Sequence, residues 1–217
     1  MKFPNAFSGI KKIWLAELLM LLAAIIGIIL IVVIATNSTL VGEEVIVNEE
    51  AVKTPASILG IATAVIALLA FILNLIGLIS ARKDDAAFMT ALFVTILGII
   101  AGAVSSIWNT NQGLVKWMDT LLTIFSMLAS YYVLTGIANL AEQLSDSATK
   151  ALALKSRTLV EGSFCATVIF KCIINIFRIQ DGSTIYTILS IVALLLELLS
   201  YILYLRALSK GKKMLAQ

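Results

Sequence analysis

Uncharged, strongly apolar stretches recur along this chain, and they constrain its fold more than any other feature. No charged residue occurs between Leu18 and Ala35, for example. About 20 apolar residues in a helix span the ~30 Å hydrocarbon core of a bilayer. Backbone N–H and C=O groups in lipid must find partners within the protein, which favours helices for runs of this length. The sequence therefore predicts an all-α, polytopic integral membrane bundle.

The composition supports a membrane environment. Of the 217 residues, 60% are hydrophobic and 13% are charged, whereas about a quarter of the residues in soluble domains are charged. A soluble fold of this size could not bury so much apolar surface. We expect a single transmembrane domain over residues 1–217, with the lipid bilayer as its main partner.

Six stretches qualify as transmembrane helices. The first is longer than the roughly 7 to 15 residues of a cleaved signal core, so we expect it to be retained. Pro55 stands where the second would begin, at a favourable first helical position. Long connections are expected at 36–55 and 141–161, and the second of these has a helical apolar spacing. The approximate spans are 13–35, 56–81, 88–108, 117–140, 162–179 and 184–205.

The distribution of Lys and Arg predicts the orientation, because cytoplasmic loops carry the excess of basic residues. With six spans, one side of the membrane holds only Lys53, Lys116 and Arg178. The sequence thus predicts a multi-pass protein of the cell membrane with both termini in the cytoplasm. The other, cytoplasmic side holds Lys2, Lys11, Lys12, Arg82, Lys83, Lys150, Lys155, Arg157, Arg206, Lys210, Lys212 and Lys213.

Small residues at helical spacing predict which faces pack together, since close helix association in lipid depends on them. Gly98 and Gly102 form a GxxxG pair in the third span. Helix packing is the plain explanation of both stripes. They comprise Thr63, Ala67, Ala70, Asn74, Gly77 and Ala81 in the second span, and Ala91, Thr95, Gly98, Gly102, Ser106 and Asn109 in the third.

Two charges fall near the middle of predicted spans. A charge at the bilayer centre costs about 2.5 to 3.5 kcal/mol on insertion scales, so each needs a partner or water. We expect Lys171 of the fifth span to pair with Glu197 of the sixth, because a short turn makes these helices antiparallel neighbours. Asn175, one turn after Lys171, and Asn74 of the second span complete the candidate binding cluster.

This polar cluster has two interpretations. Intramembrane charges often mark ion or substrate pathways, with Lys171 holding an anionic group and Glu197 relaying a proton or binding a cation. Alternatively, a neutralised pair fixes only the helix register. Tyr131 and Tyr132 lie near the middle of the fourth span, and their hydroxyls also need partners.

The absence of several motifs argues against enzymatic chemistry. The chain has no histidine, the commonest general base and metal ligand. It also lacks a Gly-rich phosphate loop, and we expect no cofactor, metal site or catalytic residue. Asp84 and Asp85 are explained by a solvated turn, and Cys165 and Cys172 are too far apart on one helix to bridge each other. Scattered basic residues disfavour nucleic acid binding.

Two functional hypotheses follow. The first is a small transporter or membrane-embedded solute-binding subunit, with a small-molecule or ion ligand at mid-membrane. The second is a non-transport structural or regulatory membrane subunit whose polar residues serve packing, either in a homo-oligomer or with a partner subunit. A water-accessible path to Lys171 and Glu197 separates them.

Overall fold

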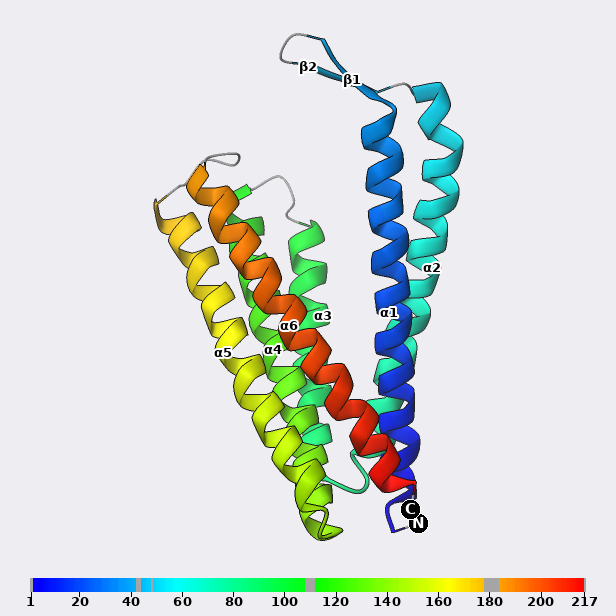
Figure 1. The fold of residues 1–217 in the computed structure, drawn as a ribbon, viewed down its shortest axis with the longest axis vertical. Coiled ribbons are helices and arrows are strands. Elements are labelled where there is room, and N and C mark those ends of the chain that lie inside the picture. Colours follow the sequence, from blue (N-terminus) through cyan, green and yellow to red (C-terminus); the bar gives the residue numbers. More distant parts are fainter. Residues whose placement is uncertain (1, 42–43, 48, 108–111, 178–183, 217) are drawn as a thin grey trace. The chain divides into compact units, whose positions relative to one another are not determined.

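The computed structural model describes residues 2–41, 44–47, 49–107, 112–177 and 184–216, and the positions 1, 42–43, 48, 108–111, 178–183 and 217 are outside that description. The chain divides into two compact units, Met1–Lys11 with Gly77–Gln217 (unit 1) and Lys12–Ile76 (unit 2). The elements (Figure 1) are α1 Pro4–Thr36, β1 Ser38–Val41, β2 Glu44–Val47, α2 Glu49–Ala81, α3 Ala86–Ile107, α4 Gln112–Gln143, α5 Ser147–Phe177 and α6 Thr184–Leu215.

Unit 2 consists of most of α1 and α2 with a hairpin between them. Strands β1 and β2 pair antiparallel, with Ser38 opposite Val47 and Val41 opposite Glu44. This hairpin lies in the connection 36–55 and is the departure from the predicted all-α fold. Helix α2 begins before the predicted span, so Pro55 lies inside the helix and not at its first turn.

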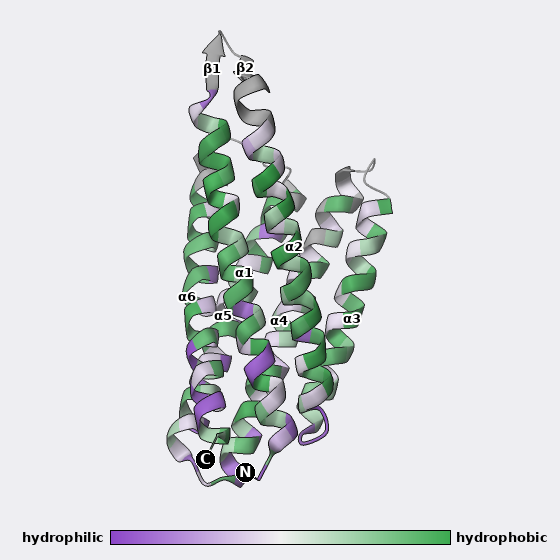
Figure 2. Cartoon of the chain, turned by 90° about the vertical axis from the view of Figure 1, so that its right-hand side faces the viewer, coloured by the Kyte–Doolittle hydropathy of each residue, from purple (hydrophilic) through white to green (hydrophobic). Residues whose placement is uncertain are grey.

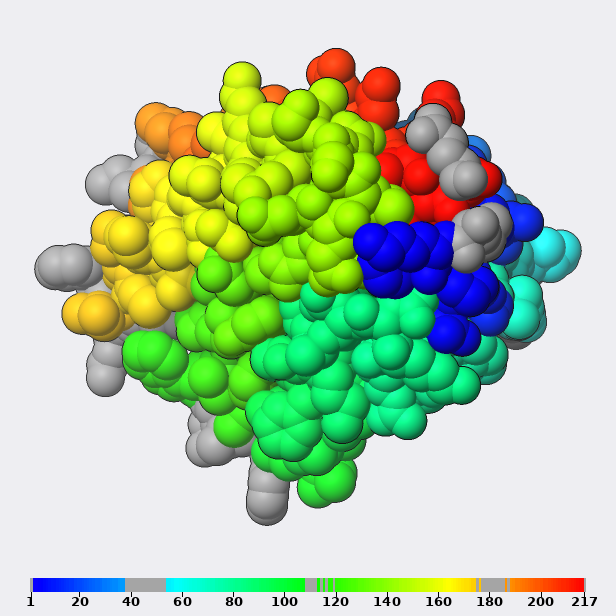
Figure 3. Space-filling view, turned by 90° about the horizontal axis from the view of Figure 1, so that it is seen from below, coloured from blue at the N-terminus to red at the C-terminus, as the bar shows by residue number. Residues whose placement is uncertain are grey.

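Unit 1 is a bundle of α3, α4, α5 and α6, completed by the first residues of α1 and the last turn of α2. Helix α4 packs against α3, α5 and α6, and α5 also packs against α6. We call the end at which α3 and α5 begin and α4 and α6 end the basal end of unit 1. Seen from that end, the first residues of α3 and α5 lie close to the N-terminal residues (Figure 3).

Five helices, within the part of the chain that the structure describes, are long and apolar enough to cross a membrane: Pro4–Thr36, Thr54–Ala81, Ala86–Ile107, Thr120–Gln143 and Ile188–Leu215. Many of their large apolar side chains are exposed, as lipid-facing residues would be, and hydrophobic colour covers most of their length (Figure 2). Helix α5 carries the predicted fifth span but is not among the five. The structure thus confirms a helical bundle with several apolar spans.

The connection between α4 and α5 is a tight turn, much shorter than the predicted connection 141–161. Asp146 N donates to Ala141 O (2.9 Å) and Ser145 N donates to Glu142 O (3.0 Å). This is the Schellman arrangement that closes a helix C-terminus. This arrangement requires a left-handed residue, and Ser145 has a φ of 57°. Of the apolar positions with helical spacing there, Ala148 and Leu152 lie in the first turns of α5, while Leu140 belongs to α4 and Leu144 to the turn.

Close helix packing in unit 1 is concentrated towards the basal end, where Leu134, Ile137 and Leu140 of α4 are buried. A Cβ added to Gly136 would lie 2.6 Å from Phe88 Cε2 of α3. The predicted packing glycines of α3 also face α4, but loosely: a Cβ at Gly98 would meet Phe125 at 3.5 Å. The predicted face is confirmed, while a much tighter contact belongs to Gly136, which the GxxxG pattern did not identify.

Candidate functional site

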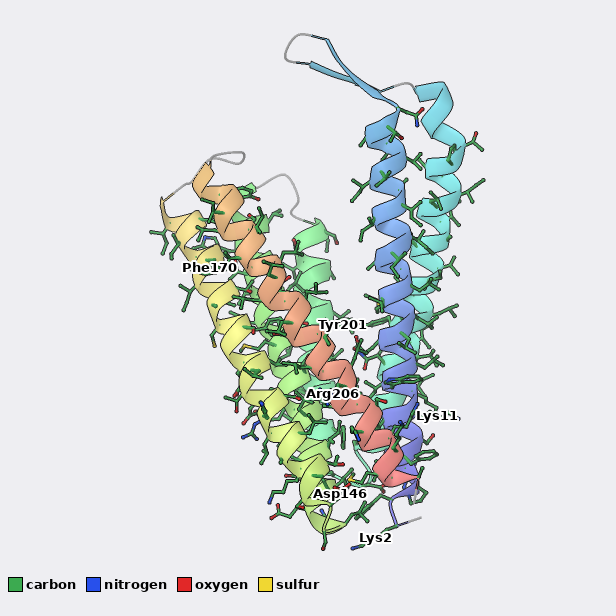
Figure 4. All side chains as sticks on the ribbon, viewed as in Figure 1. Lys2, Lys11, Asp146, Phe170, Tyr201 and Arg206 are labelled. Atoms are coloured by element: carbon green, nitrogen blue, oxygen red, sulfur yellow. The ribbon has the colours of Figure 1, made fainter. Side chains whose placement is uncertain are left out.

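Lys171 contacts the helix that sequence reasoning had not paired with it. Its Nζ donates a hydrogen bond to Thr123 Oγ1 of α4 at 2.7 Å, and both side chains are half-buried. A charged donor to a hydroxyl is stronger than a neutral hydrogen bond. This contact ties α5 to α4 about 9 Å before the last residue of α5. Phe170, the neighbouring residue, marks this level in Figure 4.

The other members of the predicted cluster are dispersed over the fold. Glu197 is half-buried on α6, about 20 Å from the start of that helix. Its pairing with Lys171 is not among the ion pairs that the structure gives for the described side chains, and it stays a prediction. The side chain of Asn175 lies outside the described residues, and Asn74 belongs to unit 2.

The contact of Lys171 is part of a polar stripe that follows the interface of α4 and α5. Steps of three, four, seven or eight residues connect its members on each helix, so they lie on one face, and Arg157 is next to Ser156 at the edge of that face. Four of them, Thr120, Ser156, Ser163 and Thr167, are buried. We call this stripe the α4–α5 seam, defined as Thr120, Thr123, Tyr131 and Thr135 of α4 with Ser156, Arg157, Ser163, Thr167 and Lys171 of α5.

Arg157 is the second cation of the seam, about 15 Å along α5 from its first residue. Its Nη1 donates to Thr135 Oγ1 at 3.4 Å, and its Cζ lies 5.0 Å from the ring centre of Tyr131. Its Nε is buried and has no hydrogen-bond acceptor. The guanidinium is therefore held by one long hydrogen bond and a cation–π contact.

Several seam hydroxyls are satisfied within their own helices. Thr135 Oγ1 donates to Tyr131 O (2.9 Å), and Thr167 Oγ1 donates to Ser163 O (3.1 Å). Such back-bonding to the preceding turn is common for threonine in helices. Ser156 is different, because its Oγ is buried without a partner. The two side-chain atoms of this kind among the described residues, Ser156 Oγ and Arg157 Nε, are on consecutive residues of the seam.

The acidic pair of the turn between α2 and α3 is not merely solvated, as the sequence had suggested. Asp84 accepts hydrogen bonds from Asn5 Nδ2 (3.0 Å) and from Ala6 N (2.7 Å), which belongs to the first turn of α1. Asp85 accepts from Ala87 N (2.8 Å) at the start of α3 and from Asn139 Nδ2 (3.1 Å) of α4. We call these six residues, Asn5, Ala6, Asp84, Asp85, Ala87 and Asn139, the basal clamp.

Further polar contacts close the basal end. Asp146 accepts hydrogen bonds from Thr149 N (2.9 Å) and Thr149 Oγ1 (2.7 Å). These bonds, the backbone one first, hold the pKa of Asp146 below its ordinary value. Lys150 pairs with Glu142 at 2.7 Å, and Lys2 Nζ donates to Gln143 O at 3.1 Å. Figure 4 shows Lys2 and Asp146 at this end.

Sequence reasoning placed Arg157 in a loop and thus missed the seam at this point. The signal available was its spacing from Lys171, because fourteen residues are close to four helical turns and return to nearly the same face. The basal clamp had no such signal, since its partners are distant in sequence. Among the described residues, no group of three or more His, Cys, Asp or Glu is arranged to hold a metal. No family model, curated protein or solved structure matches the chain.

Proposed function

We propose that this protein is a small transporter or membrane-embedded solute-binding subunit of the cell membrane, with both termini in the cytoplasm. The observation that carries the proposal is the α4–α5 seam, in which one helix pair presents two cations and a row of hydroxyls inside an apolar bundle. Ionisable residues in such positions commonly mark ion or substrate pathways. The basal end carries the basic residues Lys150, Lys155, Lys210, Lys212 and Lys213, in keeping with the positive-inside rule.

The ligand of this proposal is a small molecule or ion, and we propose no enzymatic reaction, cofactor or nucleic acid. The predicted cluster of Lys171, Glu197, Asn175 and Asn74 remains part of the candidate site. The chain has two native cysteines, the exposed Cys165 and the half-buried Cys172, and both are replaced in the labelling test that follows. Partner membrane subunits or further copies of the chain remain proposals of the same kind.

The test asks whether water reaches the seam. In a Cys165→Ala, Cys172→Ala background, Thr167→Cys places a thiol at a buried seam position, and Ile169→Cys places a matched thiol on a 55% exposed, lipid-facing position two residues away. With a polar, membrane-impermeant maleimide in intact membranes, we expect Thr167→Cys to react at least about tenfold faster, because lipid suppresses thiolate formation. Protection of both thiols would contradict a hydrated pathway.

A second function, a structural or regulatory subunit, is favoured by one observation. The hydroxyls of Thr135 and Thr167 already bond to carbonyl groups of their own helices, as they would in a dry packed interface. Native mass spectrometry of the purified protein distinguishes the two functions. A retained small molecule supports solute binding, whereas a protein subunit without a retained small molecule supports the structural role.

A further inference from the structure

The surroundings of Arg157 lack a negative charge. Among the side chains that the structure describes, no carboxylate oxygen lies within 4 Å of its guanidinium. The ion pair found among these side chains joins Lys150 and Glu142 instead. Glu161 follows Arg157 by four residues on the same helix. That spacing often gives a pair, yet Glu161 does not form one with Arg157. Neutral groups alone contact the charge of Arg157.

The guanidinium also retains unused donor capacity. Arginine has five N–H donors in a planar fork, and one of them has a protein acceptor, Thr135 Oγ1 at 3.4 Å. A buried donor without an acceptor is unfavourable, because it has given up its hydrogen bonds to water without a replacement. Nε of Arg157 is such a donor, and Ser156 Oγ, on the preceding residue, is another buried polar atom without a partner.

Tyr131 contacts the guanidinium on one side. Arg157 Cζ lies over the Tyr131 ring, 5.0 Å from its centre, as in cation–π contacts. All five N–H groups of an arginine lie in the guanidinium plane. An in-plane ligand with two adjacent oxygens matches this fork, which is why arginine binds phosphate and carboxylate in a bidentate manner.

We propose that Arg157, supported by Tyr131 and Thr135, is the binding residue for an oxyanion, either on a soluble ligand or in the headgroup of an acidic lipid. This inference rests on the proposed solute-binding function and names its ligand class. Arg206 of α6 provides the matched control. It is also an arginine, lies about 14 Å from the last residue of α6, and is exposed, so it adds positive charge at a similar level without belonging to the seam. Figure 4 shows its place on α6.

The test uses the full chain in phosphatidylcholine nanodiscs. Thermal unfolding is followed while inorganic phosphate is raised at constant ionic strength, and separately while phosphatidylglycerol replaces phosphatidylcholine. Binding to the folded state raises the melting temperature in proportion to the logarithm of ligand concentration above Kd. We expect one of the two probes to raise it for the wild type and for Arg206→Met. Arg157→Met should lose the response, with the apparent affinity falling at least about tenfold.

Arg157→Lys keeps the charge but loses the fork, so it should fold and bind several times more weakly; it also serves as the test variant if Arg157→Met does not fold. A response to phosphate supports both the inference and the solute-binding function. A response to phosphatidylglycerol alone supports the oxyanion site and contradicts the soluble ligand. The inference is overturned if neither probe stabilises the wild type, or if Arg157→Met and Arg206→Met lose the response equally. The thiol labelling of Thr167→Cys then judges the proposed function separately.

Discussion

The basal clamp and the α4–α5 seam are both polar, but they differ in how completely their groups are satisfied. In the basal clamp, each aspartate accepts hydrogen bonds from two residues, and each donor is a backbone or side-chain amide. In the seam, Arg157 has one long hydrogen bond and a buried Nε without an acceptor. A fully satisfied network makes a structure rigid, whereas an incomplete one is costly. We therefore assign the clamp an architectural role and place the proposed ligand at the seam.

We expect the largest effect from a substitution that disrupts helix packing at the basal end by a steric clash. Gly136→Leu places a side chain where the ring of the buried Phe88 lies, 2.6 Å from the position of the new Cβ. Overpacking of this kind costs about 1 to 3 kcal/mol and occasionally more. We expect most of the folded, monodisperse fraction to be lost in size-exclusion chromatography. Gly98→Ala, where the new Cβ meets Phe125 at an ordinary 3.5 Å, should keep it.

The second largest loss of stability should follow from the removal of a hydrogen-bond acceptor from the basal clamp. Asp84→Ala leaves Asn5 Nδ2 and Ala6 N without their acceptor, which costs about 1 to 3 kcal/mol in unfolding free energy. The control is Glu142→Ala, which breaks the Lys150 ion pair of 64% and 36% exposed side chains and should cost less than about 1 kcal/mol. Equal losses in reversible denaturation would show that the clamp is no stronger than a surface ion pair.

Double-mutant cycles can measure how strongly Lys171 is coupled to its neighbours in the seam. Its hydrogen bond to Thr123 Oγ1 is 2.7 Å long, so Lys171→Met with Thr123→Val should show a coupling energy of about 1.5 kcal/mol. The cycle of Lys171→Met with Glu197→Met tests the pairing predicted from the sequence. Coupling to Glu197 that exceeds coupling to Thr123 would favour the original pair over the observed contact.

The α4–α5 turn offers a smaller effect with a sign that can be checked. Ser145 has a left-handed φ of 57°, where glycine is the favoured residue. Ser145→Gly should increase the free energy of unfolding by about 0.5 to 1 kcal/mol, and the melting temperature should rise accordingly. Ser145→Ala should lower it, because alanine lacks even the polar side chain that serine can use locally. Changes of the same sign in both variants would exclude a backbone origin.

The smallest effect concerns pH. The hydrogen bonds from Thr149 lower the pKa of Asp146 from its ordinary value of 3.8. A carboxyl group whose pKa is lower in the folded state stabilises that state above the unfolded pKa, and the stabilisation is lost as pH falls through the folded pKa. The melting temperature of the wild type should therefore exceed that of Asp146→Asn at pH 7, and the difference should shrink below about pH 4. A difference that is the same at pH 3 would contradict this origin.

The helical architecture could be predicted from the sequence because the period and length of apolar runs are local signals. The position of Gly98 on a packing face followed from the same local spacing. The partners of Lys171 and Asp84 could not be predicted in this way, because Thr123 and Asn5 are 48 and 79 residues distant from them. Which helix a charged side chain faces depends on the packing order of the bundle, and hydropathy carries no information about that order.

The connection 141–161 was misjudged for a related reason. Lys150, Lys155 and Arg157 lower the mean hydropathy of the first half of α5, so a hydropathy window places the start of the span near Gly162. The helix nevertheless begins at Ser147, since helix formation in contact with other helices does not require lipid around every turn. The same basic residues explain why α5 is not among the five apolar spans.

The lengths of the helices have a consequence for which solvent stabilises each part. Helices α4, α5 and α6 have 32, 31 and 32 residues, or about 48 Å each, while hydrocarbon accounts for only ~30 Å. In the proposed orientation, the basic residues of α5 and α6 place the excess length at the basal end. Buried side chains there, such as Ile137 and Leu208, would then lie at the level of headgroups and water, where apolar burial is favourable in its own right. In this orientation unit 1 would be stabilised by the hydrophobic effect at its base and by interhelical contacts such as that of Lys171 with Thr123 within the lipid.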